Sequence, residues 1–138
     1  MNKVFLGGTC NNSIWRKKLK PLLNIAYFDP VVDDWNEEAQ LREEQEKLAS
    51  DYHLFVITKE MTGVFAIAEV VNSAWEASLN STGKFTFPVP KKVVFCVIKD
   101  GFDEHQIKSL RAVGKIIKNR GQKYFESLEE VASYLNEQ

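Results

Sequence analysis

The sequence predicts a single α/β domain, residues 1–138, in which helices cover both faces of a parallel sheet. The first observation is order, because strand-like segments alternate strictly with helix-like segments, as in sheets built from β-α-β units. The second is size, because 138 residues with 44% hydrophobic and 27% charged content can bury one sizeable core. Five strands and five helices in this length favour a flavodoxin-like three-layer sandwich, whose five-stranded sheet has the order 2-1-3-4-5.

Apolar runs and capping residues locate the elements. Ser13 is a candidate N-cap, because its hydroxyl can accept from an unpaired N–H group of the first turn. Pro21 should bend or shorten the helix that follows. Gly121 and Ser127 are expected to end one helix and cap the next. The expected strands are 3–6, 24–28, 52–58, 92–98 and 123–125. The expected helices are 14–23, 36–50, 62–79, 103–119 and one beginning after Ser127, and residues 84–90 are expected to form an extended loop.

Apolar spacing indicates which helix faces are buried. In the third helix the expected buried stripe is Val64, Ile67, Ala68, Val71 and Trp75. In the fourth helix it is Ile107, Leu110, Val113 and Ile117. Glu69 lies well away from the centre of the first stripe, so periodicity alone places it on the surface.

Composition excludes several classes of protein. The formal net charge of −1 argues against a nucleic-acid partner, which normally meets a basic excess. No apolar run is long enough to span a membrane, and none resembles a signal peptide, so a cytoplasmic setting is expected. Cys10 and Cys96 form no metal motif and are expected to remain unbridged, with Cys96 in the core. No metal site and no cofactor is predicted.

The predicted topology indicates where a ligand would bind. In such sheets ligands bind beyond the carboxyl ends of the strands, at the switch point between strands 1 and 3, where the strand order reverses. The loops that follow the first three strands, residues 7–13, 29–35 and 59–63, meet there, whereas Asp51 begins a strand at the opposite edge. Neither a phosphate-binding P-loop nor a GxGxxG pattern occurs. The candidate binding residues are Gly7, Gly8, Thr9, Asn11, Asn12, Asp33, Asp34, Trp35, Thr62 and Gly63.

Several candidates have an ordinary structural explanation as well. Asp33 and Asp34 suit a turn or helix cap, although a sugar or base contact is also open, with Asp34 favoured. Trp35 suits either base stacking or packing at a helix start. Thr9 and its asparagine neighbours suit a sugar or phosphate contact, or simply a polar loop. Arg16 suits a contact to a 5′-phosphate, or a surface position within the basic cluster 16–20.

Three segments of the sequence resemble those of a known family. KVFLGGTCNNSIWR, YFDPVVDDWNEEAQ and DYHLFVITKEMTGVFAIAEVV, in that order, resemble the nucleoside 2-deoxyribosyltransferase-like proteins. The resemblance covers the first half to two thirds of the chain. It implies cleavage of an N-glycosidic bond by a helix carboxylate, here Glu69, through a glycosyl-enzyme intermediate. A further family acid falls near Glu43, and a family tyrosine matches Phe5, which has no hydroxyl.

The resemblance also implies the partners. They are a small-molecule nucleoside or nucleotide and further copies of the chain, since family members generally form homo-oligomers. Three functions follow as expectations. The first is a nucleoside deoxyribosyltransferase, and the second is a nucleoside 5′-monophosphate N-hydrolase in which water replaces the acceptor base. The third, motivated by Phe5, is a binding or interaction module of the same fold without catalysis.

Overall fold

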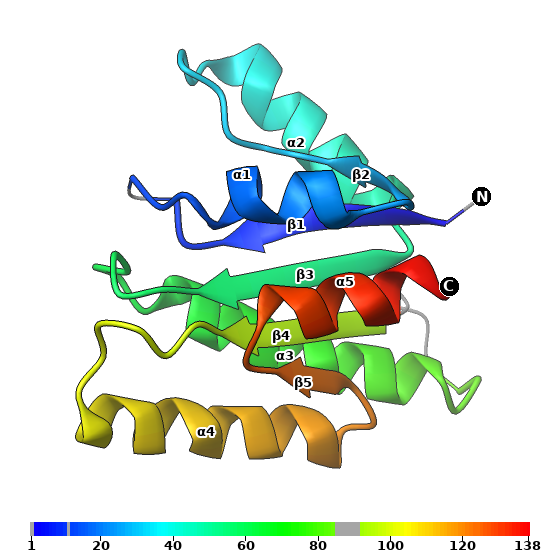
Figure 1. The fold of residues 1–138 in the computed structure, drawn as a ribbon. Helices are drawn as coiled ribbons and strands as arrows, with labels where there is room; N and C mark the ends of the chain where they lie inside the picture. The colour runs from blue at the N-terminus through cyan, green and yellow to red at the C-terminus, as the bar shows by residue number, and fades with distance from the viewer. Residues whose placement is uncertain (1, 11, 85–91) are drawn as a thin grey trace.

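The computed structural model describes residues 2–10, 12–84 and 92–138 and has the predicted architecture. All strand pairs are parallel, and the order is β2-β1-β3-β4-β5 (Figure 1). The strands are β1 (Lys3–Gly8), β2 (Ala26–Phe28), β3 (Tyr52–Ile57), β4 (Lys92–Val97) and β5 (Lys123–Phe125). The helices are α1 (Trp15–Leu19), the 3-10 turn η1 (Lys20–Leu22), α2 (Glu37–Ala49), α3 (Phe65–Asn80), α4 (Glu104–Asn119) and α5 (Leu128–Asn136).

The central strand is β3, and every one of its residues is buried, as predicted. Its register sets Gly8 of β1 beside Val56 and Val97 of β4 beside Ile57. The carboxyl ends of three neighbouring strands therefore meet at one edge. At the opposite edge Asp51 accepts a hydrogen bond from the backbone N–H of Lys3 at 3.0 Å, so it holds strand starts together.

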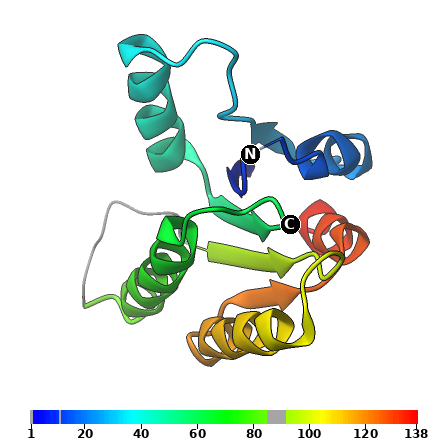
Figure 2. The ribbon, with the colours of Figure 1, turned by 90° about the vertical axis from the view of Figure 1, so that its left-hand side faces the viewer.

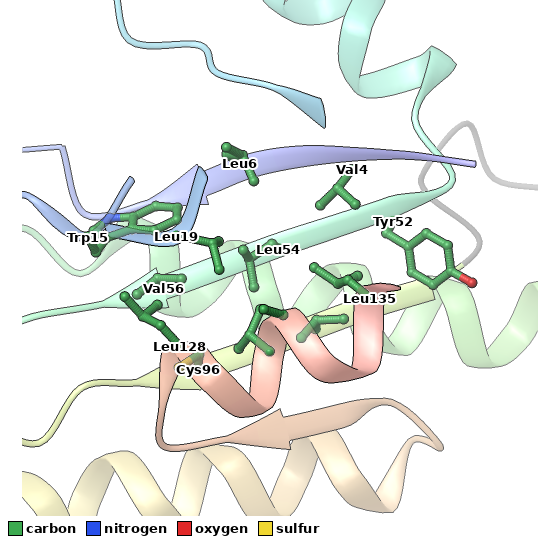
Figure 3. Packing of buried hydrophobic residues seen from close by; sticks show 13 residues of the cluster. Val4, Leu6, Trp15, Leu19, Tyr52, Leu54, Val56, Cys96, Leu128 and Leu135 are labelled. Carbon is green, nitrogen blue, oxygen red and sulfur yellow. The ribbon is translucent and has the colours of Figure 1, made fainter. Parts of the chain in front are cut away.

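One face of the sheet is closed by α1 and α5 (Figure 3). Alternate residues of β1 and β3, such as Leu6 and Leu54, point into this core. Trp15 meets them from α1 and Leu135 from α5, and both are buried. Cys96 lies in the same cluster, as expected, and burial raises the pKa of its thiol to about 12.

The other face carries α2, α3 and α4, and these three cover it unequally. Helices α3 and α4 pack on β3 and β4 through apolar side chains. Helix α2 has no buried residue and stands away from the sheet (Figure 2). Its half-buried residues are Ala39, Glu43, Glu46 and Lys47, so the inner side of α2 is mostly charged.

The buried face of α3 differs from the prediction. The residues that pack on the sheet are Val70, Ser73, Ala74 and Ala77. In the predicted stripe, Ile67 and Val71 are half-buried and pack against this core, whereas Val64, Ala68 and Trp75 are exposed. The helix is apolar on two opposite sides, and the sheet takes the side with small residues because these allow close packing. In α4 Leu110 and Ile117 are buried, as predicted.

Most of the predicted helix ends are confirmed. Helix α1 stops before Pro21, which lies in η1, and Gly121 follows α4 with a φ of 77°. Ser127 caps α5 by accepting from the N–H of Glu130. Ser13 is not the predicted cap, because its hydroxyl contacts the Thr58 hydroxyl at 2.9 Å instead. The predicted 84–90 loop lies outside the described residues except for its first position.

Within the described ranges, no helix combines the length and the hydropathy that crossing a membrane requires.

Candidate functional site

The loop after β1 is fixed against the end of β3. Gly8 has a φ of 115°, and a Cβ there would lie 2.2 Å from the carbonyl oxygen of Val56. The next N–H group, that of Thr9, donates to the same carbonyl at 2.8 Å. The Thr9 hydroxyl in turn accepts from the N–H of Thr58 at 3.1 Å. Only glycine fits at position 8. Both the backbone N–H and the side-chain hydroxyl of Thr9 are hydrogen-bonded to the end of β3 and the residue after it.

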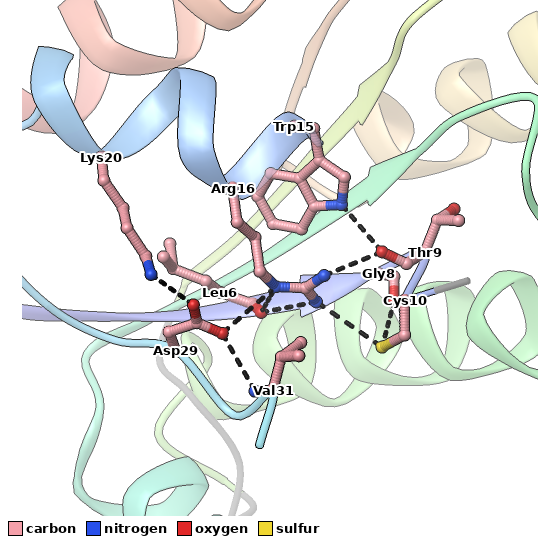
Figure 4. A network of polar contacts seen from close by, with 9 residues as sticks. All are labelled: Leu6, Gly8, Thr9, Cys10, Trp15, Arg16, Lys20, Asp29 and Val31. Carbon is pink, nitrogen blue, oxygen red and sulfur yellow. Dashed lines mark hydrogen bonds and ion pairs between the residues drawn. The ribbon is translucent and has the colours of Figure 1, made fainter. Parts of the chain in front are cut away.

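A buried guanidinium supports this loop from α1 (Figure 4). Arg16 is 5% exposed, and its donors reach the carbonyl oxygens of Leu6 at 2.9 and 3.1 Å and of Thr9 at 2.8 Å. Trp15 donates to the same Thr9 carbonyl at 2.9 Å. Asp29, after β2, lies 3.6 Å from Arg16 and also pairs with Lys20. Burial lowers the pKa of Arg16, and the Cys10 and Asp29 side chains partly oppose that shift.

This network corrects the interpretation of the basic cluster. Arg16 is not a surface cation, and its hydrogen bonds hold the backbone of the first loop rather than pointing to solvent. Lys17 and Lys18 are exposed, as a solvated face would be. The polar side chains of this region therefore shape the loop from within.

A second charged group lies on the opposite face of the sheet, between α2 and α3. Lys47 of α2 lies 3.3 Å from Glu69 of α3 and 3.5 Å from Glu43, one turn earlier on its own helix. The Glu69 side chain is 28% exposed and the Lys47 side chain 33%. Glu69 is therefore half-buried rather than on the open surface, and one ammonium group joins it to a second carboxylate.

The floor beneath these charges is aromatic. The Lys47 ammonium lies 5.5 Å from the ring centre of Phe5 in β1. That ring meets His53 of β3 edge-on at 4.8 Å and Phe28 of β2 at 5.9 Å. A Cβ at Gly7 would approach Nε2 of His53 to 2.9 Å, so glycine is required for the imidazole to fit.

His53 stays neutral in this position. Burial first, and the nearby Lys47 charge second, lower the pKa of His53 to about 3. Its Nε2 is buried and has no hydrogen-bond partner among the described residues. The floor thus holds an uncharged polar atom beneath a positively charged one.

The other candidate residues are less tightly held. Asp33, Asp34 and Trp35 are exposed in the segment between β2 and α2. Thr62 and Gly63 are exposed just before α3, which begins at Phe65 rather than at the predicted position 62. Nothing lies within 4 Å of a Cβ built at Gly63, so no close approach requires glycine there. Asn12 is exposed with a φ of 51°, and Asn11 lies outside the described residues.

A hollow of about 490 Å³ does lie at the carboxyl edge of the sheet. Its walls include Ser13 from the first loop, Thr58 and Glu60 from the end of β3 and the loop after it, and Glu126 after β5. Neither Glu69 nor the segment from Asp33 to Trp35 lines it. None of the candidate binding residues that the structure describes lines this hollow, and Glu69 lies apart from it between α2 and α3. The structure therefore does not bring the predicted binding residues together in this hollow.

Sequence reasoning missed Lys47 and gave His53 no role. One local signal for Lys47 exists, because Glu43 and Lys47 have the spacing of a helical ion pair. The contact between Lys47 and Glu69 spans two elements and leaves no such signal. His53 occupies a strand position where the apolar pattern predicts a core side chain.

The chemistry available at Glu69 follows from its neighbours. An ionised carboxylate held by an ammonium group can attack an electron-poor carbon, and a second carboxylate nearby can move a proton. Within the described ranges, no three His, Cys, Asp or Glu side chains cluster as metal ligands. Glu69, Lys47 and Glu43 together suit nucleophilic and acid–base chemistry.

Comparison with known proteins adds one finding. A family model described as "Nucleoside 2-deoxyribosyltransferase like" matches residues 1–100, which include β1 to β4 and both Glu43 and Glu69. No curated protein and no solved structure matches the chain.

Proposed function

The chain belongs to the nucleoside 2-deoxyribosyltransferase-like family, and we propose that it cleaves or transfers the N-glycosidic bond of a nucleoside or nucleotide through Glu69. The observation that carries this proposal is the position of Glu69, half-buried on α3 and paired with Lys47 at 3.3 Å. The pairing gives Glu69 a partner on the neighbouring helix, and a carboxylate nucleophile has to be oriented toward the carbon that it attacks.

In the first step a Glu69 carboxylate oxygen attacks the anomeric carbon of the sugar. The bond from this carbon to the base nitrogen breaks, and its electron pair leaves with the base. The base takes up a proton from water. The product is a glycosyl ester of Glu69, as in retaining glycosidases.

In the second step the ester is broken by a new nucleophile at the same carbon. A nitrogen of an acceptor base gives transfer, and its proton is released. Water gives hydrolysis, and the carboxylate of Glu69 is restored in both cases. The hydrolase alternative is favoured if a 5′-phosphate increases the rate, and the transferase if the phosphate makes no difference.

Substrate contacts are assigned to the loops around the strand ends. Asp33, Asp34 and Trp35 are exposed before α2 and free to meet a sugar or a base. Thr62 and Gly63 precede α3, which carries Glu69, and the predicted group also includes Gly7, Gly8, Asn11 and Asn12. Thr9, by contrast, is buried and serves the loop itself through its hydroxyl and carbonyl.

A second function is favoured by the floor beneath Lys47. Phe5 is buried and offers no hydroxyl to Glu69, so Lys47 is the group that holds the carboxylate. If a cation in this position binds Glu69 too firmly for attack, the chain is a nucleotide-binding module without catalysis. Stabilisation by nucleotides without base release would identify this case.

The wider setting is also part of the proposal. We expect a homo-oligomer, supported by the exposed apolar side of α3. Cys10 and Cys96 are free thiols, which supports a reducing, cytoplasmic location.

The test is base release, followed by chromatography, from deoxyribo- and ribonucleosides and their 5′-monophosphates, with and without an acceptor base. Glu69→Gln removes the nucleophile while keeping the shape of the side chain. We expect release by the wild-type chain and a loss of at least about 1,000-fold in the variant.

The matched control is Glu76→Gln, which alters an acid two turns further along α3 that contacts Asn72 on its own helix. It should release base at the wild-type rate. Release that persists in Glu69→Gln would contradict the nucleophile assignment, and binding without any release would select the non-catalytic module.

A further inference from the structure

Phe65 begins α3 and leaves its aromatic ring in water. The residue is 76% exposed, the largest fraction among the large hydrophobic residues that the structure describes. A single exposed hydrophobic residue is ordinary on a protein surface. What distinguishes this ring is its position next to Glu69, the proposed nucleophile.

Phe65 and Glu69 are four residues apart on α3, so they lie on the same side of the helix, one turn from each other. The Cβ atoms of such a pair are about 5–6 Å apart. Side chains on a helix lean toward its N-terminus, so the Glu69 side chain leans toward the turn that carries Phe65. The ring is therefore a direct neighbour of the carboxylate, on the side nearer the carboxyl edge of the sheet.

This side of α3 is not the one that faces α4. Val64 and Trp75 line a groove of about 980 Å³ between α3 and α4, and neither Phe65 nor Glu69 lines it. Glu69 instead meets Lys47 of α2 at 3.3 Å. Helices α2 and α3 lie on the same side of the sheet (Figure 2). Phe65 thus belongs to the side of α3 that carries the charged group shared with α2.

The proposed reaction restricts where the base lies. The Glu69 carboxylate attacks the anomeric carbon from the side opposite the departing base, with the reacting atoms about 3–3.5 Å apart. The base is one covalent bond beyond that carbon and projects away from the carboxylate. It therefore requires a surface beside Glu69, at a distance that a side chain one helical turn away can reach.

Phe65 provides such a surface, and its chemistry suits a base. Lys47 and Glu43, which are joined to Glu69 from α2, are charged and offer no flat apolar face. Every nucleobase has a π-face that can stack on an aromatic side chain. We propose that Phe65 stacks on the base of the bound nucleoside or nucleotide and orients it while Glu69 attacks the sugar.

This inference rests on the proposed function and adds a substrate range to it. A phenyl ring has no group that reads the hydrogen-bonding edge of a base, so stacking on Phe65 accepts purines and pyrimidines alike. The larger purine ring covers more of the phenyl face and should bind more tightly. The chain should therefore act on both classes of base, with a preference for purines.

The test measures the binding of deoxyadenosine and thymidine by calorimetry in a Glu69→Gln background, which lacks the proposed nucleophile. Phe65→Leu keeps an apolar side chain but removes the ring, and it should raise both dissociation constants by about 5-fold or more. It should also reduce the preference for deoxyadenosine over thymidine. Phe65→Tyr keeps the ring and should restore both the affinity and the preference.

The matched control is Val64→Ala in the same background. Val64 is 74% exposed and adjacent in sequence, but it faces the groove toward α4. This variant should bind both nucleosides as its parent does. Circular dichroism of all variants should match the parent, since both positions are solvated and neither contributes to the core.

The outcomes separate this inference from the proposed chemistry. Base release by the wild type, together with unchanged nucleoside binding in Phe65→Leu, would overturn the stacking role and leave the chemistry in place. Binding that depends on Phe65 without base release would keep the stacking role and overturn the chemistry. A Phe65→Leu variant that changes sedimentation but not nucleoside affinity would assign the ring to a contact between copies. Failure of both nucleosides to bind the Glu69→Gln parent would overturn the stacking role.

Discussion

Two cations lie on opposite faces of the sheet beside β1, and their surroundings differ in kind. Arg16 is buried, and its guanidinium is bonded to two backbone carbonyl oxygens with Asp29 nearby. Lys47 is one-third exposed, and its partners among the described residues are side chains, the carboxylates of Glu43 and Glu69. Arg16 fixes the backbone of the loop after β1, whereas Lys47 and its two carboxylates are partly exposed, so a ligand can reach them and change their pairing.

The difference follows from what each cation is attached to. Backbone carbonyls at the end of a strand cannot move without breaking the sheet, so Arg16 acts on stability. Carboxylates on two helices can change partners at little cost, because a half-exposed ion pair contributes less than about 1 kcal/mol. Function is therefore expected on the Lys47 side and rigidity on the Arg16 side.

The largest expected effect on stability comes from removing Arg16, the cation that holds the loop after β1. Arg16→Met keeps much of the side-chain volume but removes the guanidinium donors to the Leu6 carbonyl and one of the two side-chain donors to the Thr9 carbonyl, which keeps only Trp15. We expect the free energy of unfolding to fall by about 3–5 kcal/mol. Urea denaturation measures this change. A loss below 1 kcal/mol would show that the two sides do not differ as described.

An intermediate effect on stability is expected from His53, which lies among the aromatic rings beneath Lys47. His53 has a pKa of about 3 in the folded chain, against an ordinary value of 6.5. Below pH 6.5 the imidazole of His53 therefore binds a proton in the unfolded chain but not in the folded chain. The free energy of unfolding is consequently highest above pH 6.5 and falls as the pH drops toward 3. By pH 5 this loss should reach about 2 kcal/mol.

The measurement compares unfolding free energies at pH 7 and pH 5 for the wild type and for His53→Phe, which keeps an aromatic ring on the floor. The variant should lose less stability between the two pH values. The control is His105→Gln, at an exposed position on α4, and it should follow the wild type. Equal pH dependence in wild type and His53→Phe would contradict the neutral, buried state.

The smallest effect on stability is expected at Lys47 itself. Lys47→Met should change the unfolding free energy by less than about 1 kcal/mol. Base release should nevertheless fall by up to about 100-fold, because Glu69 loses the group that fixes its direction. Lys47→Arg should restore most of the rate. A stability loss comparable to that of Arg16→Met, with an unchanged rate, would reverse the roles of the two cations.

The same comparison explains how far the sequence could predict the structure. Apolar runs indicated the strands, because each strand supplies its own local signal. The order 2-1-3-4-5 followed from the strict alternation of strands and helices, which favours a flavodoxin-like sheet. The covered side of α3 was predicted only in part. Ile67 and Val71 do pack against the core, but both sides of the helix are apolar, and the sheet selects the side with the small residues Ala74 and Ala77.

The site was predictable only in part. The resemblance of the third segment pointed to Glu69, but its partner Lys47 comes from another helix, and no sequence spacing encodes that contact. Arg16 stands among basic neighbours that are exposed, so composition alone indicated a surface residue. Its burial follows from its bonds to the carbonyl oxygens of Leu6 and Thr9, which come within reach of one guanidinium group only once β1 and its loop have folded.

The separation of α2 from the sheet has a consequence for motion. This helix buries no side chain and is secured mainly near its last turns, where Glu46 pairs with Lys3 and Lys47 with Glu69. Its backbone amides should exchange with solvent by local opening, at a free energy well below that of global unfolding. Lys47 and Glu43 would then leave the group together while Glu69 stays on the packed helix α3. The half of the site on α2 can thus adjust to a bound molecule without any change in the core.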